Sequence, residues 1–320
     1  MKRTKLLVIL AVILAVLAVP VVIFCIRPPV LVVTDAPFVL LYGKSHLRRQ
    51  QFAASLALFR RVKPVIVADD AGSDVVNIAI QGAARQPSCV LFPRNQSAAA
   101  LRFHEQSPET PVALFSGLVS IPEIPPPNGY LCIYGTDRLT DLYRAGLFAG
   151  ILGNIPSKPV KKVKKKDESA AVSPVSSVST PKTYVLWQDK YVQAAGRELF
   201  SQGVHEKDPE SGIIFANSAD DMPDMKVISC AVLTGAGAEY LGKNPRMPLI
   251  LFSWLNPDFA AREIVVLFDD SAWALTVPAV RMAVQQEAQG TIPSKPLIFS
   301  AKIAHNGVVR MLKKSAKKVP

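Results

Sequence analysis

Short, wholly apolar segments alternate with helix-length segments along most of the chain, and this alternation limits the fold more than any other feature. Three of the apolar segments are PVIVAD at 64–69, SCVLF at 88–92 and PVALF at 111–115. None has the polar–apolar alternation of a strand with one solvent-facing side, so each is expected to be covered on both faces, as in a parallel sheet. Parallel strands need crossovers, and right-handed helical crossovers produce a doubly wound α/β sheet.

The same pattern starts again after residue 139, which predicts a second doubly wound sheet. The helix expected at 139–152 carries a face of small residues for close packing: Ala145, Gly146, Ala149 and Gly150. We assign residues 28–135 and 258–290 to lobe 1, and residues 136–257 and 291–310 to lobe 2. Hinge crossovers near Tyr134, Trp254 and Gly290 would join the lobes. A loop is expected at 35–43, a helix at 45–62, and a single last strand at 297–303.

The N-terminal segment predicts a location at the cell membrane. Residues 6–26 form a run of 21 residues without a charge, after the basic Lys2, Arg3 and Lys5. Such a helix is about 30 Å long, the thickness of a bilayer core. The positive end should stay in the cytoplasm, which places the rest on the periplasmic, extracytoplasmic face. Residues 1–27 are therefore an uncleaved anchor or a signal segment with a lipidated Cys25.

The net charge of +12 is concentrated outside the predicted lobes. Residues 155–182 carry a net charge of +5, and the tail 307–320 carries another +5. The remaining body is nearly neutral, so no basic face for nucleic acid is expected. Composition predicts a flexible Lys/Ser/Pro-rich insert at 156–182 and a basic tail at 311–320. The alternative for both basic segments is contact with anionic lipid headgroups.

The segment 134–152, YGTDRLTDLYRAGLFAGIL, resembles the type I periplasmic binding proteins. In that family a strand crosses a hinge and enters an alanine- and glycine-rich helix through a segment that carries an aspartate, here Asp137. Residues 263–308 are similar to the C-terminal part of the basic membrane lipoprotein branch, which includes nucleoside-binding proteins. The resemblance covers residues 30–310. It implies the substrate-binding component of an ABC-type importer, with a small-molecule ligand and an ABC permease as partners.

Ligands of open α/β sheets lie beyond the carboxyl ends of the strands, and two facing sheets would leave a cleft for a small polar molecule. The candidate ligand-binding residues are those that follow the predicted strands: Asp35, Phe38, Asp70, Arg94, Asn95, Ser116, Gln188, Asp189, Asn217, Thr234, Trp254 and Asp270. Asp69, the neighbour of Asp70, lies at the same strand end. Phe38 and Trp254 could stack on a flat or sugar-like surface. Alternatively, Asp70 and Asp270 are helix N-caps, and Arg94 pairs with a surface carboxylate.

Catalytic motifs are missing from the sequence, which contains no GxSxG, P-loop or GxGxxG pattern. Cys89, Cys132 and Cys230 lie in apolar strands and are expected to be buried thiols, and Trp187 is expected in the core. We therefore predict no enzymatic activity, no metal and no cofactor. The alternative to a transport component is a membrane-tethered sensor or scaffold with the same fold.

Overall fold

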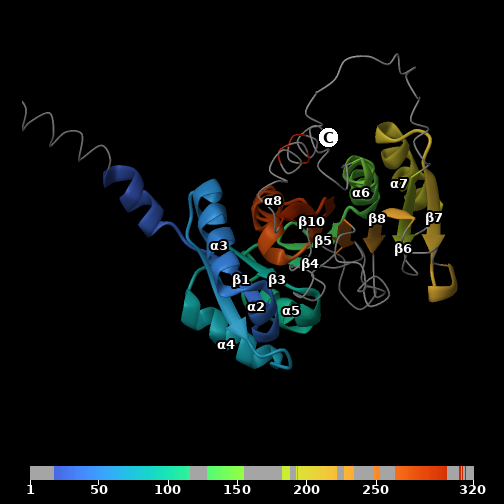
Figure 1. Cartoon of the computed structure of the whole chain (residues 1–320). Coiled ribbons are helices and arrows are strands. Elements are labelled where there is room, and N and C mark those ends of the chain that lie inside the picture. The colour runs from blue at the N-terminus through green and yellow to red at the C-terminus, as the bar shows by residue number, and fades with distance from the viewer. Residues whose placement is uncertain are drawn as a thin grey trace, which may run out of the picture. The chain divides into compact units, whose positions relative to one another are not determined.

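The computed structural model describes residues 18–115, 128–154, 182–187, 192, 194–221, 227–233, 248–252, 264–300, 310, 312 and 314. The chain divides into two compact units (Figure 1). The first unit comprises Met1–Asp137 and Asp270–Lys295, and the second comprises Arg138–Asp269 and Pro296–Pro320. Each unit is built on a six-stranded sheet within the described part of the chain.

All neighbouring strands of the first sheet pair in parallel. In sheet order the strands are β11 (Gln289–Ile292), β5 (Leu131–Thr136), β4 (Val112–Phe115), β3 (Cys89–Phe92), β1 (Val30–Asp35) and β2 (Val62–Val67). The strand residues from Val30 to Val33 are at most 1% exposed. This complete burial is the reason that the apolar runs of the sequence show no alternation.

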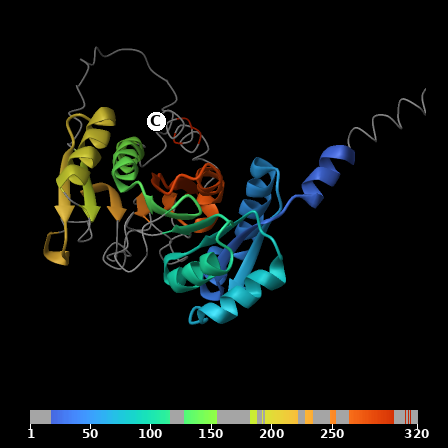
Figure 2. The same ribbon diagram turned by 180° about the vertical axis from the view of Figure 1, so that it is seen from behind.

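Helices pack against the first sheet in two pairs (Figure 1, and Figure 2 from behind). One pair is α4 (Ser73–Ala83) with α5 (Ser97–Gln106), and the other is α3 (Lys44–Leu58) with α8 (Ala272–Val284). Leu31 and Val33 of β1 share a buried cluster with α4 and α5. Thr34, which faces the other way, accepts a hydrogen bond from Trp273 of α8 at 2.9 Å.

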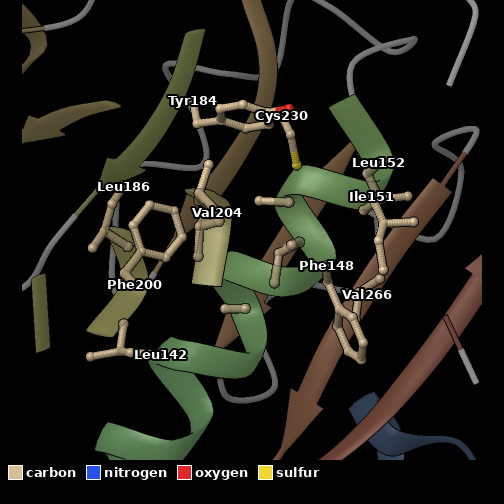
Figure 3. Close-up of a cluster of buried hydrophobic side chains, with 14 of the residues drawn as sticks. Leu142, Phe148, Ile151, Leu152, Tyr184, Leu186, Phe200, Val204, Cys230 and Val266 are labelled. Atoms are coloured by element: carbon tan, nitrogen blue, oxygen red, sulfur yellow. The ribbon is translucent and has the colours of Figure 1, made fainter. Parts of the chain in front are cut away.

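The second sheet repeats this arrangement with a different set of strands. In sheet order they are β12 (Lys295–Ser300), β10 (Ile264–Asp269), β9 (Leu249–Phe252), β8 (Ile228–Leu233), β6 (Thr183–Trp187) and β7 (Gly212–Ala216). Side chains of α6 (Arg138–Gly153) and α7 (Ala194–Lys207) converge with those of the strands on one apolar core (Figure 3). Phe148, Phe200 and Tyr184 are completely buried there, and Trp187 is only 6% exposed, as predicted.

The small-residue face predicted on α6 is confirmed by the contact that α6 makes with α7. A Cβ atom on Gly146 would lie 2.2 Å from the carbonyl oxygen of Phe200. A Cβ atom on Gly203 would lie 2.2 Å from the carbonyl oxygen of Tyr143. The two backbones can approach this closely only because both positions lack a side chain.

Several predicted boundaries are wrong. The loop expected at 35–43 is a helix, α2 (Ala36–Tyr42), whose first turn accommodates Pro37 because that turn needs no backbone donor. The helix expected at 45–62 ends at Leu58. The last strand expected at 297–303 is confirmed over its described residues as β12, and the strand before it, β11 in the other sheet, was not predicted.

The predicted lobe boundaries differ from the two units in the same region. Residues 264–269 were assigned to lobe 1, but β10 pairs with β9 in the second sheet. The polypeptide passes into the first unit only after Asp269. Thr291 and Ile292 were assigned to lobe 2, but they pair with β5 in the first sheet. An apolar strand pattern predicts that a segment is buried. It does not predict to which of two similar sheets the strand belongs.

At the N-terminus, residues 18–26 are helical, and Cys25 is exposed on this helix. Among the residues that the structure describes, no helix has both the length and the apolar character needed to cross a bilayer. Residues 1–17, most of the predicted insert and most of the basic tail lie outside the described residues.

Candidate functional site

The carboxyl ends of β1 and β3 mark the point where the first sheet changes direction. From β1 the chain continues to β2 on one side, whereas from β3 it continues to β4 on the other side. The two crossovers therefore leave the adjacent ends of β1 and β3 in opposite directions. In doubly wound sheets this is the position at which ligands bind, because the diverging loops leave the strand ends accessible.

Three polar side chains meet at this point. The side-chain amide of Asn95, in the short helix η1 (Arg94–Gln96) that follows β3, donates to Asp35 Oδ2 at 2.9 Å. The same nitrogen donates to Asp69 Oδ1 at 3.2 Å. Asp35 is the last residue of β1, and Asp69 lies just after β2. Asn95 thus connects the ends of three adjacent strands and holds two carboxylates close together.

Asp35 has acceptor capacity that the described residues do not use. Its Oδ1 atom is inaccessible to solvent and has no hydrogen-bond partner there. Asp35 also occupies the N-cap position of α2, but its side chain makes no capping hydrogen bond. A buried acceptor without a donor costs about 1–3 kcal/mol, so this end of β1 is less stable than one with every acceptor paired.

Aromatic side chains extend from the same strand end. Phe38, in the first turns of α2, is partly exposed and stacks on Tyr42 with ring centroids 4.8 Å apart. Phe38 thus offers a partly exposed aromatic ring three residues after Asp35. Arg94 is exposed beside Asn95, and Asp70 is exposed beside Asp69.

The second sheet changes direction between β6 and β8. The candidates expected at those strand ends, Gln188, Asp189 and Thr234, lie outside the described residues, as do Ser116 and Trp254. Asn217 is described and follows β7, the edge strand. Its backbone N–H donates to Asp221 at 2.9 Å. This hydrogen bond and two further ones from Ser218 lower the pKa of Asp221 below its ordinary value.

The two capping alternatives are wrong. The N-cap of α4 is Gly72, two residues after Asp70, and Asp70 lies in the preceding turn. The N-cap of α8 is Ser271, whose hydroxyl accepts from the N–H of Ala274 at 3.3 Å. Serine is a favoured capping residue, and here it takes the position next to Asp270. Asp270 stands at the start of the first unit's second segment and is partly buried.

A buried ion pair in the second unit was not expected from the sequence. Asp141 is completely buried in α6 and accepts from Arg144, 9% exposed, at 3.3 Å. The Arg144 guanidinium also lies over the ring of Phe268, 5.6 Å from its centroid. Polar residues in the first turns of a helix usually face solvent, so the sequence alone gave no sign of this burial.

The thiols predicted to be buried are buried. Cys89, Cys132 and Cys230 are free and solvent-inaccessible, and burial raises the pKa of each thiol. Among the described residues, no group of three or more His, Cys, Asp or Glu side chains is placed to hold a metal ion.

No family model matches the chain, and no curated protein is detectably similar to it in sequence. Solved structures are similar in fold. An ABC transporter solute-binding protein from Conexibacter woesei is 11% identical, with a TM-score of 0.50 over 91% of this chain and 96% of that one. The chain has the type I periplasmic-binding-protein fold.

Two further solved structures match the chain with TM-scores of 0.49. An arabinose-binding protein from Geobacillus stearothermophilus is 13% identical, over 86% of this chain and 97% of that one. A transcriptional activator of the comK gene from Bacillus halodurans is 9% identical, over 92% and 98%.

Proposed function

We propose that this chain is an extracytoplasmic ligand-binding protein, the substrate-binding component of an ABC-type importer for a small polar molecule. The observation that carries the proposal is the cluster of Asp35, Asp69 and Asn95 at the point where the first sheet changes direction. The ABC transporter solute-binding protein with the same fold supports it. We therefore propose that the site binds its ligand reversibly and catalyses no reaction.

The chemistry of the cluster indicates the kind of ligand. The two carboxylates of the cluster are hydrogen-bond acceptors, so the ligand should present several donors. The exposed part of Phe38 adds an apolar surface on which a ring can pack. Sugars and other polyols combine these features. The similarity of 263–308 to the basic membrane lipoprotein branch adds nucleosides to the ligands that should be tested.

The apolar segment 6–26 supports a position at the membrane, with the two units on the outer face. A tethered binding protein stays close to its permease, so we propose an ABC permease as the membrane partner.

The decisive experiment is mass spectrometry of the small molecule that co-purifies with the protein, followed by thermal-shift measurements with sugars, polyols, nucleosides and amino acids. A specific ligand should raise the melting temperature by mass action. Asn95→Leu removes the shared donor and leaves two adjacent carboxylates unscreened, so affinity should fall about tenfold or more. Gln81→Leu, on the exposed face of α4, is the matched control and should leave affinity unchanged.

The outcomes separate the two functions. A ligand whose affinity depends on Asn95, together with recovery of the protein in a complex with a permease, supports the importer component. A full panel without any thermal shift, together with recovery in a complex with a membrane protein that is not a transporter, would instead favour a sensor or scaffold.

A further inference from the structure

The outward side of α3 combines exposed apolar and basic side chains in a way that the candidate ligand site does not explain. Phe52 is 71% exposed and Leu56 is 67% exposed, although large apolar side chains are usually buried. Arg48 and Arg49 are exposed one turn before them. Residues four apart lie on one side of a helix, so these four residues form a continuous surface, here called the α3 face.

The opposite side of α3 is fully engaged in the first unit. Leu47, Gln50 and Ala54 are buried, and Gln50 accepts a hydrogen bond from Lys295 at 3.2 Å. The exposure of Phe52 and Leu56 is therefore not due to a loosely attached helix. α3 is fixed in one orientation and holds its apolar and basic side chains outward.

The charge of the α3 face has one sign. The sequence of α3, KSHLRRQQFAASLAL, contains Lys44, Arg48 and Arg49 but no acidic residue. Exposed large apolar side chains and arginines are the residue types through which helices contact the headgroup region of a membrane. An anionic headgroup complements such a surface because opposite charges attract.

The α3 face also continues from the segment that would anchor the chain. The ring of Phe24, near the end of the apolar run 6–26, lies edge-on to Phe59 at the end of α3, with centroids 5.9 Å apart. The Arg27 guanidinium lies over the same ring, 5.4 Å from its centroid. The helix of residues 18–26 exposes further apolar side chains, among them Val21 and Ile26. The end of the anchor thus contacts the residue that caps α3, three positions after Leu56, the last residue of the α3 face.

We propose that the α3 face lies on the lipid surface, with Phe52 and Leu56 in the interfacial region and Arg48 and Arg49 on anionic headgroups. The inference rests on the membrane anchor of the proposed function and goes beyond it, because it assigns a second contact with the bilayer. That contact would fix one orientation of the first unit above the membrane.

The test uses the full chain reconstituted into vesicles of phosphatidylcholine with phosphatidylglycerol. Cys25, an exposed cysteine, is replaced by serine, and a nitrobenzoxadiazole fluorophore is placed at Ala53→Cys, which lies between Phe52 and Leu56 on the exposed side. Ile78→Cys on α4 is the matched control, because Ile78 is 68% exposed near Asp74, which pairs with Arg102 at 2.5 Å. Lipids carrying a nitroxide on the acyl chain quench a fluorophore that reaches them.

Fluorescence at position 53 should shift to the blue and be quenched roughly twofold more than at position 78. Phe52→Gln with Leu56→Gln should lower the quenching at position 53 to that at position 78, whereas Val75→Gln on α4 should not. Arg48→Gln with Arg49→Gln should lower it mainly in the vesicles that contain phosphatidylglycerol.

Equal quenching at positions 53 and 78, in protein that floats with the vesicles, would overturn the proposal and leave the anchor intact. A blue shift at position 53 that grows with the protein-to-lipid ratio and resists nitroxide lipid would show that a second copy of the chain covers the face. Protein that leaves the vesicles in high salt would refute the anchor. In that case, quenching at position 53 in low salt would still show whether the α3 face contacts lipid.

Discussion

Thr34 is buried and precedes Asp35, the acidic residue at the centre of the candidate site. Its hydroxyl donates to the carbonyl oxygen of Val32 at 3.2 Å and accepts from the indole N–H of Trp273 at 2.9 Å. Thr34 and Trp273 are 3% and 2% exposed, so water cannot replace either hydrogen bond. The pair joins the end of β1 to α8 directly behind Asp35.

Replacing Thr34 with valine keeps the volume but leaves the Trp273 indole N–H buried without an acceptor. The expected loss is about 1–3 kcal/mol in the free energy of unfolding of the first unit. Denaturant unfolding followed by tryptophan fluorescence measures it. Thr34→Ser, which keeps the hydroxyl, is the control and should cost less. An unchanged midpoint for Thr34→Val would show that the indole finds another acceptor.

Tyr184 gives the second unit a dependence on alkaline pH. Its hydroxyl is buried and donates to Asp208 at 2.8 Å, and both burial and that carboxylate raise the pKa of the phenol above its ordinary value. The unfolded chain loses this proton near pH 10, while the folded chain keeps it. The unfolded state then binds fewer protons, so stability must fall as the pH rises above about 10.

Tyr184→Phe should therefore reduce the slope of unfolding free energy against pH above pH 10 by up to about 1.4 kcal/mol per pH unit. Chemical denaturation at a series of alkaline pH values measures the slope. Tyr130→Phe is the control, because the side chain of Tyr130 is 37% exposed. An identical slope in Tyr184→Phe would mean that the phenol ionises equally in both states.

The candidate site was predictable where a residue follows an apolar strand directly. The positions of Asp35 at the end of β1 and of Asn95 in the helix after β3 agree with the prediction, because the carboxyl end of a parallel strand can be located from the sequence, while their role in binding stays a prediction. The hydrogen bonds of Asn95 to Asp35 and Asp69 were not predictable, since they depend on which strands are neighbours. The buried pair of Asp141 and Arg144 was missed for a similar reason, because only tertiary packing decides which side of α6 is covered.

At the scale of elements, the contact of α6 with α7 depends on two glycines that face each other. Gly203→Ala would place a methyl group 2.2 Å from the carbonyl oxygen of Tyr143, which is backbone and cannot rotate away. The helices must separate, at an expected cost of about 1–3 kcal/mol or more. Thermal or chemical unfolding of the second unit measures this cost.

Gly82 provides the matched control on another helix. It lies in α4, and no atom lies within 4 Å of the place that an added methyl group would take. Gly82→Ala should therefore stabilise the first unit by about 0.5–1 kcal/mol through the lower entropy of the unfolded chain. Destabilisation by both substitutions to the same extent would show that the loss in Gly203→Ala is not due to the helix contact.

Elements with a strong apolar pattern were predicted, and elements without one were not. The strands β2, β3 and β4 are recognisable because burial on both faces leaves their sequences uniformly apolar. β11 has the sequence QGTI and lies at the edge of the first sheet, where one side of its backbone has no strand neighbour in the described part of the chain. α2, expected to be a loop, has Pro37 in its first turn, where proline is compatible with a helix.

At the scale of the whole molecule, the chain passes from one unit to the other three times, after Asp137, Asp269 and Lys295. Neither unit is therefore one continuous segment, and the first unit is completed only by residues 270–295. The insert that begins after α6 is not a crossing between the units, because both of its flanking residues belong to the second unit.

The base of this insert is closed by contacts of the flanking residues. The Lys182 side chain donates to the side-chain oxygen of Asn154, and Asn154 donates to the carbonyl oxygen of Gly150 at 2.8 Å. The carbonyl oxygen of Lys182 accepts from Gly212 at 2.8 Å, at the start of the pairing of β6 with β7. The ends of the insert are thus held together by the fold itself.

Replacing residues 156–181 with a short Gly/Ser linker should leave the second unit folded and stabilise it by about 1 kcal/mol, because each halving of a loop lowers the closure cost by roughly 0.6 kcal/mol. Chemical denaturation measures the difference. Asn154→Ala in the same shortened chain removes the contact that closes the base and should lower the gain. A shortened chain that fails to fold would show that residues 156–181 contribute contacts to the second unit, since closure of the loop alone can only favour the folded state.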